Sequence, residues 1–420
     1  MSNKFFFECV TCGRIIDPEA TEYLCPDCRG KEEFGKPPLG VLKTLYNYKV
    51  IRSKYKGKVF SHLKKTNYLD LLPIKELTSL SYLKIGKTPL YRIDQIKVGK
   101  KNFELYLKDD SQNPTFSYKD RASNLVSALA REKDINTIIT ASTGNAGSSL
   151  AGICASQGQK ALIFTPSNAP KAKLTQILMY GALLIPVSGT YDDAFDLSIK
   201  ATEEFGWYNR NTAFNPFTIE GKKTAAFEIF DQLDESIPDR IFVPVGDGVI
   251  ISGIYKGFED LLSLNIIEKI PEIVAVQSSG SNNLIGNLNN TKFVSRKSNT
   301  IADSISVDIP RNFEMAKKFI LSYAGKGIEV TDQEILSASE MLSKNTGIFA
   351  EPAAAAAYAG FLKYNSKNMI RPGTKNVVLL TGSGLKDLDS VQPVLKIPNA
   401  VEPDIVALRK LSLLNKLIAG

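Results

Sequence analysis

Residues 136–166 read NTIITASTGNAGSSLAGICASQGQKALIFTP and contain one strand–helix–strand unit. The apolar runs NTIITAS and KALIFTP have the length of buried strands, and NAGSSLAGICASQG between them has the composition of a packed helix. Two strands separated by a helix of this length predict a right-handed crossover in a mainly parallel sheet. Ligands of such sheets bind beyond the carboxyl ends of the strands, where loops enter helices.

The same alternation continues on both sides of this unit. Further strand-like runs are ELYLK (104–108), ALLIPVSG (182–189), RIFVPVG (240–246), EIVAVQSSG (272–280) and NVVLLTGSG (376–384). Helical stretches follow several of them: NLVSALAREK (124–133), APKAKLTQILMYG (169–181), DDAFDLSIKATEEFG (192–206), VIISGIYKGFEDLLSL (249–264) and EPAAAAAYAG (351–360). Residues 40–80 look helical and connecting. The pattern predicts an α/β fold, and a length of 420 residues suggests two or more domains.

Composition narrows the classes of function. The first residues, MSNKFFFECV, contain no apolar stretch typical of a signal peptide, and no run has the length of a membrane span, which predicts a cytoplasmic protein. The net charge of +8 is not gathered in a basic run with aromatic residues, so we expect no nucleic-acid partner. A single histidine, His62, excludes a three-histidine metal site and argues against a Ser-His-Asp triad. Proton chemistry here must use other side chains or a cofactor.

Four of the five cysteines lie in the first 28 residues, as Cys9-x₂-Cys12 and Cys25-x₂-Cys28. Each pair can place two thiolates on one turn, and two such turns complete a tetrahedral site that suits Zn²⁺. Four protein ligands leave no open position, so the predicted site is structural. The alternatives are two disulfides or four unrelated thiols. Cys154 lies in an apolar helical run and is interpreted as a core residue.

The segment 113–123, NPTFSYKDRAS, places Lys119 at the start of a helix. The positive end of a helix helps to keep a lysine amine neutral, and a neutral amine can react with an aldehyde. A lysine beside Asp120 and Arg121 is, taken alone, more typical of a solvated surface ion pair.

Three further loops follow predicted strands. Residues 142–147, STGNAG, could bind a carboxylate through free N–H groups and hydroxyls, or could simply cap a helix. Residues 245–249, VGDGV, could hold a phosphate at a helix N-terminus, although Asp247 would repel it if its side chain pointed inward. The loop lacks the Walker A and GxGxxG patterns, and its alternative interpretation is an ordinary turn. Thr381, after NVVLL, offers a hydroxyl that could meet a ring nitrogen.

Taken together and in this order, these segments resemble the fold-type II, tryptophan-synthase-β-like enzymes that use pyridoxal 5′-phosphate (PLP), and among them the threonine synthase family. The resemblance extends to about residue 390. NPTFSYKDRAS is similar to NPTGSFKDRG, ASTGNAG to ASTGNT, and PVGDG to PVGNAGN. GKTPLYRI (86–93), GIFAEPAAAA (347–356) and LLTGSGLKD (379–387) resemble further motifs of the family.

The resemblance implies two parallel-sheet, three-layer domains and an N-terminal zinc-ribbon-like module. The implied division is residues 1–35 for the module, 36–121 with 226–420 for a large cofactor-binding domain, and 122–225 for a smaller α/β domain. It also implies a homodimeric lyase of threonine biosynthesis that converts O-phospho-L-homoserine and water to L-threonine and phosphate.

The resemblance also implies site residues. Lys119 would be catalytic and would hold PLP. The other implied cofactor-binding residues are Asn145, Gly246, Asp247, Gly248, Val249, Ile250 and Thr381. Ser142 and Thr143 would bind the substrate carboxylate. Ser167, Asn168 and Lys173 are candidates for the substrate phosphate, or else form a capped, basic helix start. Cys9, Cys12, Cys25 and Cys28 would bind structural Zn²⁺.

Several positions depart from the family pattern. TGNT is TGNA here, which removes a hydroxyl at Ala146, PVGN is PVGD, and a frequent histidine is Ser383. None of these changes removes Lys119 or Thr381, so they weaken the choice of substrate more than the choice of cofactor. A serine/threonine dehydratase or a β-replacement synthase is the first alternative. A zinc-ribbon binding protein with a degenerate enzyme body is the second.

Overall fold

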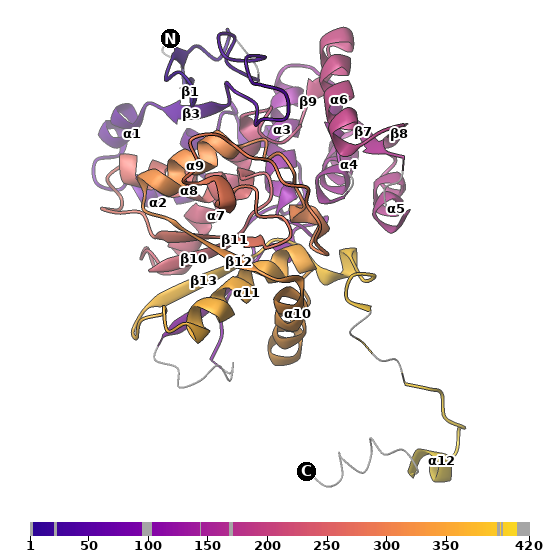
Figure 1. Cartoon of the computed structure of the whole chain (residues 1–420). Coiled ribbons are helices and arrows are strands. Elements are labelled where there is room, and N and C mark those ends of the chain that lie inside the picture. Colours follow the sequence, from indigo (N-terminus) through magenta and orange to yellow (C-terminus); the bar gives the residue numbers. More distant parts are fainter. Residues whose placement is uncertain are drawn as a thin grey trace.

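The computed structural model describes residues 3–20, 23–94, 103–142, 144–167, 171–392, 395 and 398–409. Three sheets organise these residues (Figure 1). The first is a small antiparallel sheet of order β2-β1-β3, formed by β1 (Phe5–Cys9), β2 (Ile15–Ile16) and β3 (Leu42–Tyr46). Because β1 pairs along its whole length with β3, the cysteine module shares its sheet with the segment after residue 40.

The largest sheet has six strands in the order β12-β11-β10-β13-β5-β4. Its strands are β4 (Leu90–Arg92), β5 (Glu104–Asp109), β10 (Arg240–Pro244), β11 (Glu272–Ser278), β12 (Lys326–Val330) and β13 (Lys375–Leu380). All neighbours are parallel except β4, which runs antiparallel to β5 at one edge. The sequence-based prediction of a mainly parallel sheet is therefore confirmed.

The second parallel sheet has four strands in the order β8-β7-β6-β9. Its strands are β6 (Thr137–Ala141), β7 (Lys160–Pro166), β8 (Leu183–Val187) and β9 (Tyr208–Asn209). The unit formed by β6, the helix α4 (Asn145–Gln157) and β7 is the one that the opening stretch of sequence predicted. Strands β1, β2, β3, β4, β9 and β12 were not predicted: β2, β4 and β9 have two or three residues, and the others lie in segments without a long apolar run.

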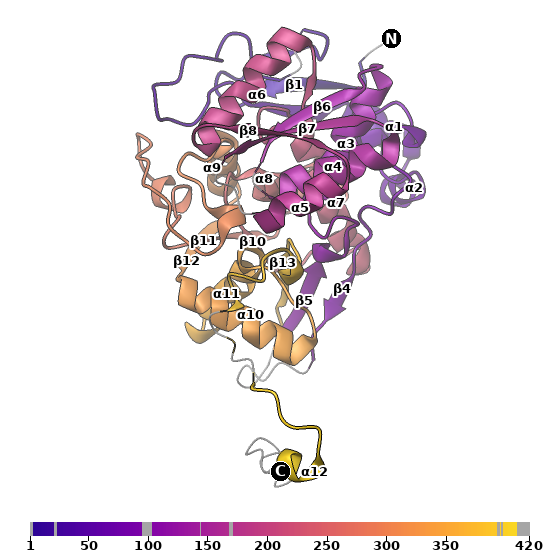
Figure 2. The ribbon, with the colours of Figure 1, turned by 90° about the vertical axis from the view of Figure 1, so that its right-hand side faces the viewer.

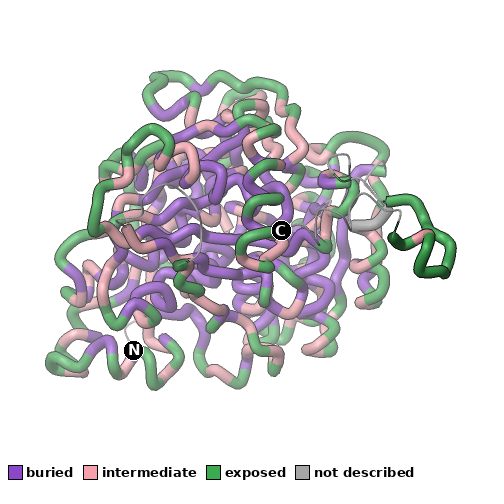
Figure 3. The backbone as a smooth tube through the Cα atoms, turned by 90° about the horizontal axis from the view of Figure 1, so that it is seen from below, coloured by how far each residue is buried: buried purple, intermediate pink, exposed green. Residues whose placement is uncertain are grey.

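Helices cover both faces of the two parallel sheets (Figure 2). The described helices are α1 (Tyr48–Tyr55), α2 (Val59–Lys65), α3 (Lys119–Glu132), α4 (Asn145–Gln157), α5 (Lys171–Met179), α6 (Tyr191–Phe205), α7 (Phe217–Gln232), α8 (Val249–Ser263), α9 (Phe313–Ser322), α10 (Asp332–Thr346), α11 (Pro352–Ser366) and α12 (Ile405–Arg409). The helix α12 lies away from the rest of the chain and is exposed (Figure 3). None of the described helices is long and apolar enough to cross a membrane.

The side chains of successive strand residues point into opposite cores, as the two-residue period of a strand requires. In β10, Ile241 and Val243 join the core under α7, α8 and α9, whereas Phe242 joins the core under α10 and α11. The alanines of α11 allow its backbone to lie close to the sheet. A Cβ at Gly360 would come within 2.6 Å of Val276, so this helix has no room for a larger residue there.

Candidate active site

Two adjoining cavities meet at Lys119, the first residue of α3. The narrower one lies beside the loop that enters α8 and is lined by Lys119, Asn145, Thr212, Pro244, Val245, Gly246, Asp247, Gly248, Val249, Ile250, Ile251, Ser304, Ile305, Glu351, Ala353 and Thr381. The wider one, of about 380 Å³, opens between the two parallel sheets and is lined partly by Ser142, Gly144, Ala146, Tyr191, Arg210 and Thr212. The three loops that the sequence singled out therefore converge on one lysine.

Burial and a nearby positive charge lower the pKa of the Lys119 amine. Its pKa is lowered to about 8, first by burial and then by the charge of Arg210, while Asp247 and Glu351 act in the opposite direction. A pKa near 8 leaves an appreciable fraction of the amine neutral at neutral pH, and the amine needs that form to react with a carbonyl group.

The two residues after Lys119 have a structural role that their sequence neighbourhood did not suggest. Asp120 is buried and accepts a hydrogen bond from the Thr115 amide (2.7 Å), which fixes the turn before the helix. Arg121 is buried between Asp110 and Glu228, at 2.6 Å from each carboxylate. The expected solvated surface pair is therefore a buried network that anchors α3 and so holds Lys119 in place.

Asn145 begins α4 and lies beside Glu351 at the start of α11. Its side-chain amide donates to both carboxylate oxygens of Glu351, at 2.8 and 3.0 Å. The Glu351 backbone amide in turn donates to the carbonyl of Gly382 (3.1 Å), the residue after Thr381. Sequence reasoning assigned no role to Glu351, although its position before the alanine-rich helix marked a helix start.

The glycine turn before α8 has the features of an anion cradle. Gly248 has a φ of +85°, and a Cβ there would lie 2.9 Å from Ala316; a Cβ at Gly246 would lie 3.0 Å from the Ile305 backbone. The first N–H groups of α8 lack intrahelical acceptors, and residues 249–251 line the narrow cavity. These features fit the phosphate of PLP.

Asp247 engages the loop before α9. Its Oδ1 accepts a hydrogen bond from the Arg311 amide (3.1 Å). Burial raises its pKa, while Arg311, Lys119 and Lys222 oppose that rise. The carboxylate therefore has a donor and nearby cations, which limits its repulsion of a phosphate in the turn.

Lys222, on α7, is a buried lysine within the electrostatic influence of this cluster. Burial and the charges of Arg210 and Lys119 hold its pKa well below the usual value, and Asp247 opposes the shift. Its Nζ makes a weak, 3.4 Å hydrogen bond to the carbonyl of Thr218. The neutral form of the Lys222 amine is therefore favoured, and Asp247 is the charge that opposes this shift.

Arg210 and Thr212 line the wide cavity and were missed by sequence reasoning. Arg210 is buried, its Nε donates to Ser123 Oγ at 3.2 Å, and its Nη2 has no hydrogen-bond partner among the described residues. A buried guanidinium nitrogen without an acceptor suits an anionic ligand. Strand β9, which places this segment beside the cavity, is only two residues long and gave no sequence signal.

The remaining predicted site residues divide into three groups. Ser142 lines the wide cavity, and its Oγ accepts from the amides of Gly144 (3.1 Å) and Gly147 (2.9 Å), so its hydroxyl hydrogen can still bond a ligand. Thr381 lies in the narrow cavity at the end of β13. Ser167 is exposed and does not line either cavity, whereas Thr143, Asn168 and the side chain of Lys173 lie outside the described residues.

The four predicted metal ligands come together at the N-terminal sheet. The Sγ atoms of Cys9, Cys12, Cys25 and Cys28 all lie within 4.8 Å of one another. Cys9 and Cys28 are 3.8 Å apart, and Cys12 and Cys25 are 3.9 Å apart. Four thiolates at about 2.3 Å from one tetrahedral ion would be about 3.8 Å apart, so the cluster has the size of a zinc site.

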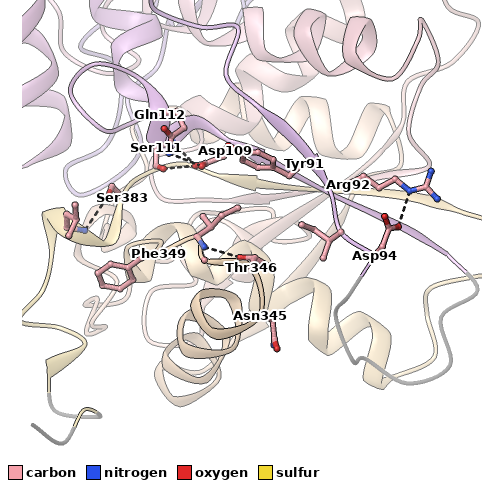
Figure 4. Close-up of a pocket in the computed structure, with 14 residues that line it drawn as sticks. Tyr91, Arg92, Asp94, Asp109, Ser111, Gln112, Asn345, Thr346, Phe349 and Ser383 are labelled. Carbon is pink, nitrogen blue, oxygen red and sulfur yellow. Dashed lines mark hydrogen bonds and ion pairs between the residues drawn. The ribbon is translucent and has the colours of Figure 1, made fainter. Parts of the chain in front are cut away.

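Another cavity, of about 700 Å³, lies on the far side of the β13 loop (Figure 4). It is bounded by Tyr91 and Arg92 of β4, by Asp109, and by Phe349 and Ser383. The carboxylate of Asp109 is occupied by Ser111, whose hydroxyl donates to it at 2.6 Å (Figure 4). Of the predicted site residues that the structure describes, none lines this cavity.

The fold and the converging loops define a PLP enzyme, and comparison with known proteins agrees. Residues 82–382 match the model of a family described as pyridoxal-phosphate dependent enzyme. The chain therefore belongs to the pyridoxal-phosphate dependent enzyme family.

The chain is 34% identical to a threonine synthase of Methanocaldococcus jannaschii over 96% of this chain and 98% of that one. It is 33% identical to a threonine synthase of Methanosarcina acetivorans over 97% and 98% of the two chains. Among solved structures, a threonine deaminase of Solanum lycopersicum superposes with a TM-score of 0.63 at 22% identity, over 81% of this chain and 93% of that one. Maize serine racemase superposes with the same TM-score at 23% identity, over 74% and 92%. At such identities these two structures support the fold alone.

Proposed function

We propose that this chain catalyses the threonine synthase reaction, in which O-phospho-L-homoserine and water give L-threonine and phosphate. Similarity to threonine synthases over nearly the whole chain supports this reaction. The observation that carries the substrate class is the buried guanidinium of Arg210, which lines the wide cavity together with Lys119 and has an Nη2 without a described partner. A phosphate-bearing substrate supplies the acceptor that this nitrogen lacks, whereas free serine or threonine brings no second anion.

The cofactor role is proposed for residues on three elements. Lys119 would hold PLP, with Thr381 facing the ring nitrogen and Asn145 beside the ring. The glycine turn would bind the cofactor phosphate through Gly246, Asp247, Gly248, Val249 and Ile250. Bound PLP supplies an electron sink that stabilises negative charge at the carbon atoms of the substrate.

Residues of the chain would transfer protons and bind the carboxylate and phosphate groups of the substrate. The amine of Lys119, with its lowered pKa, takes a proton from Cα and delivers protons further along the substrate. Ser142 and the N–H groups at the start of α4 hold the substrate carboxylate. Arg210 and Thr212 hold the phosphate group and neutralise charge as its bond to Cγ breaks. Asn168 and Lys173 remain proposed contributors, whereas Ser167 lines neither cavity. A hydroxyl at Thr381, in place of a carboxylate, leaves the ring nitrogen largely unprotonated and favours elimination and replacement over transamination.

The test is a substrate screen read as phosphate release and as amino-acid product. We expect threonine and stoichiometric phosphate from O-phospho-L-homoserine. Formation of 2-oxobutyrate from threonine, without threonine from phosphohomoserine, would establish a dehydratase instead. Absence of absorbance at about 410–420 nm in protein purified with PLP would overturn the enzyme assignment altogether.

The matched variants for the substrate class are Arg210→Gln and Arg131→Gln, the latter an exposed arginine at the far end of α3. Loss of a charged hydrogen bond to phosphate costs about 1.5–3 kcal/mol, so Arg210→Gln should raise KM for phosphohomoserine by about 10–100-fold. Arg131→Gln should leave KM unchanged. An unchanged KM in Arg210→Gln would remove Arg210 from the phosphate site.

We further propose that Cys9, Cys12, Cys25 and Cys28 bind one structural Zn²⁺. Free thiolates require a reducing compartment such as the cytoplasm. The proposed domains are residues 1–35; 36–121 with 226–420; and 122–225. We also propose a homodimer, which sedimentation analysis would test.

A further inference from the structure

The cysteine module contacts the segment that carries Arg210. Tyr23 lies two residues before Cys25, and its ring stacks on Phe214 with ring centroids 4.6 Å apart and an interplanar angle of 19°. Its Oη accepts a hydrogen bond from the backbone amide of Asn209 at 3.1 Å. Tyr23 thus contacts Asn209, which precedes Arg210 in the chain, and Phe214, which follows it.

The Asn209 amide has a specific need for this acceptor. Strand β9 forms the edge of the four-stranded sheet and pairs on one side with β6. The amide of Arg210 donates to Ile139 on that side (2.8 Å), so the amide of the preceding residue points away from the sheet. Asn209 is fully buried, and water cannot satisfy its amide without local opening. Tyr23 supplies the missing acceptor.

The other end of the segment is strained. Ala213 has a φ of +60°, a left-handed conformation that a residue with a Cβ rarely adopts. It is buried and directly follows Thr212, which lines the wide cavity. Such strain persists only where surrounding contacts fix the backbone, and the stacking of Tyr23 on Phe214 is one of those contacts.

The module is packed firmly enough to act as a support. The rings of Phe5 and Phe7 each lie 5.6 Å from the ring of Phe217 at the start of α7. Cys9, Cys25 and Cys28 belong to the same buried cluster as Tyr208 and Phe217. The contacts of Tyr23 therefore connect the 208–214 segment to a fixed body.

We propose that Tyr23 is a positioning residue for phosphate binding: the cysteine module, through Tyr23, holds residues 208–214 so that Arg210 and Thr212 face the wide cavity. The inference rests on the proposed function, because it takes Arg210 as the phosphate-binding cation. It gives the module a role in substrate affinity, which structural zinc alone would not imply.

The experiment compares Tyr23→Phe, Tyr23→Leu and a control in the same module, Phe34→Ala, whose ring is fully exposed. PLP absorbance and zinc content are measured first, followed by the affinity of the PLP-loaded protein for inorganic phosphate, read as a spectral titration. KM and kcat for phosphohomoserine follow, with hydrogen exchange of residues 208–214. Phosphate affinity needs no turnover, so it reports on Tyr23 even if phosphohomoserine is not the substrate.

Tyr23→Phe should weaken phosphate affinity and raise KM by about fivefold, the effect of one lost neutral hydrogen bond, with kcat nearly unchanged. Tyr23→Leu, which also loses the stacked ring, should weaken phosphate affinity and raise KM roughly tenfold or more. Both variants should speed exchange in residues 208–214, and Phe34→Ala should change nothing. Unchanged phosphate affinity in both Tyr23 variants would overturn the proposal, as would faster exchange without weaker affinity. If Tyr23→Leu loses zinc or PLP, Tyr23→Phe alone decides.

Discussion

The side-chain amide of Asn145 donates to both carboxylate oxygens of Glu351, at 2.8 and 3.0 Å, and so joins the first residue of α4 to the residue that precedes α11. One helix packs on the four-stranded sheet and the other on the six-stranded sheet. The bond therefore crosses the interface between the two parallel sheets, next to Lys119.

Loss of this contact should weaken PLP binding. Glu351→Ala leaves the Asn145 amide without its carboxylate partner, so the side chain beside the proposed cofactor site is no longer held. We expect PLP affinity to fall by about 10–100-fold, the effect of losing hydrogen bonds to a charged group. Equilibrium titration of the PLP-free protein measures this. Glu340→Ala, an exposed glutamate on α10, is the control, and equal affinities in the two variants would contradict the prediction.

Incorporation of PLP should depend on pH through Lys119. Because the pKa of this amine is lowered to about 8, its neutral fraction rises with pH up to that value and then levels off. We expect the rate of PLP loading to increase by about tenfold per pH unit below pH 8 and to flatten above it. Stopped-flow absorbance of PLP-free protein from pH 6 to 9.5 measures this. A rate that still climbs between pH 9 and 9.5 would mean that the amine keeps its ordinary pKa, and Lys119→Ala should show no loading step.

Lys222 and Asp247 should be energetically coupled. Asp247 favours the charged form of Lys222, and Lys222 favours the charged form of Asp247. The two single substitutions, Asp247→Asn and Lys222→Gln, should therefore together destabilise the protein by more than the double substitution does. A double-mutant cycle with Lys222→Gln should give a coupling of about 1 kcal/mol in urea unfolding of the PLP-free protein. Additive changes would show that the two side chains act independently.

Asp247→Asn should also shift the pH dependence of PLP loading. Asp247 raises the pKa of Lys119, so Asp247→Asn should lower that pKa below about 8 and shift the loading profile to lower pH. Arg210→Gln removes the cation that lowers this pKa and should shift the profile the other way. Shifts of equal sign in the two variants would be incompatible with this electrostatic account.

Metal removal should unfold the N-terminal module. Cys12 is the exposed member of the cluster, and Cys12→Ala leaves three thiolates for the ion. We expect about one zinc per chain in the parent protein and substantially less in this variant, with a Tm lower by several degrees. Elemental analysis and thermal unfolding measure both quantities. The control is Cys154→Ala, a buried cysteine outside the cluster, which should keep its zinc; zinc-free parent protein would refute the site.

Sequence alone determined the elements and the residue types. The two-residue and 3.6-residue periods specified most strands of the two parallel sheets and many of the helices. The rule that ligands bind beyond the carboxyl ends of parallel strands indicated the loops after β6, β10 and β13. The resemblance of the ordered motifs to a known family was needed to assign Lys119, the glycine turn and Thr381 to one site, whereas the cysteine spacing alone was enough to predict a four-thiolate cluster. Each of these inferences depends on local spacing or on a general rule of chain topology.

Only the tertiary structure decided the electrostatics and the supports of the site. In the folded chain, Asp120 and Arg121 are buried and anchor α3, and Asp247 influences the pKa of Lys222. The Arg210 guanidinium lacks a full set of hydrogen-bond acceptors among the described residues. Tyr23 reaches Asn209 across 186 positions of sequence. Desolvation and the distance between charges depend on the packing of elements that are remote along the chain, so no local pattern could have predicted them.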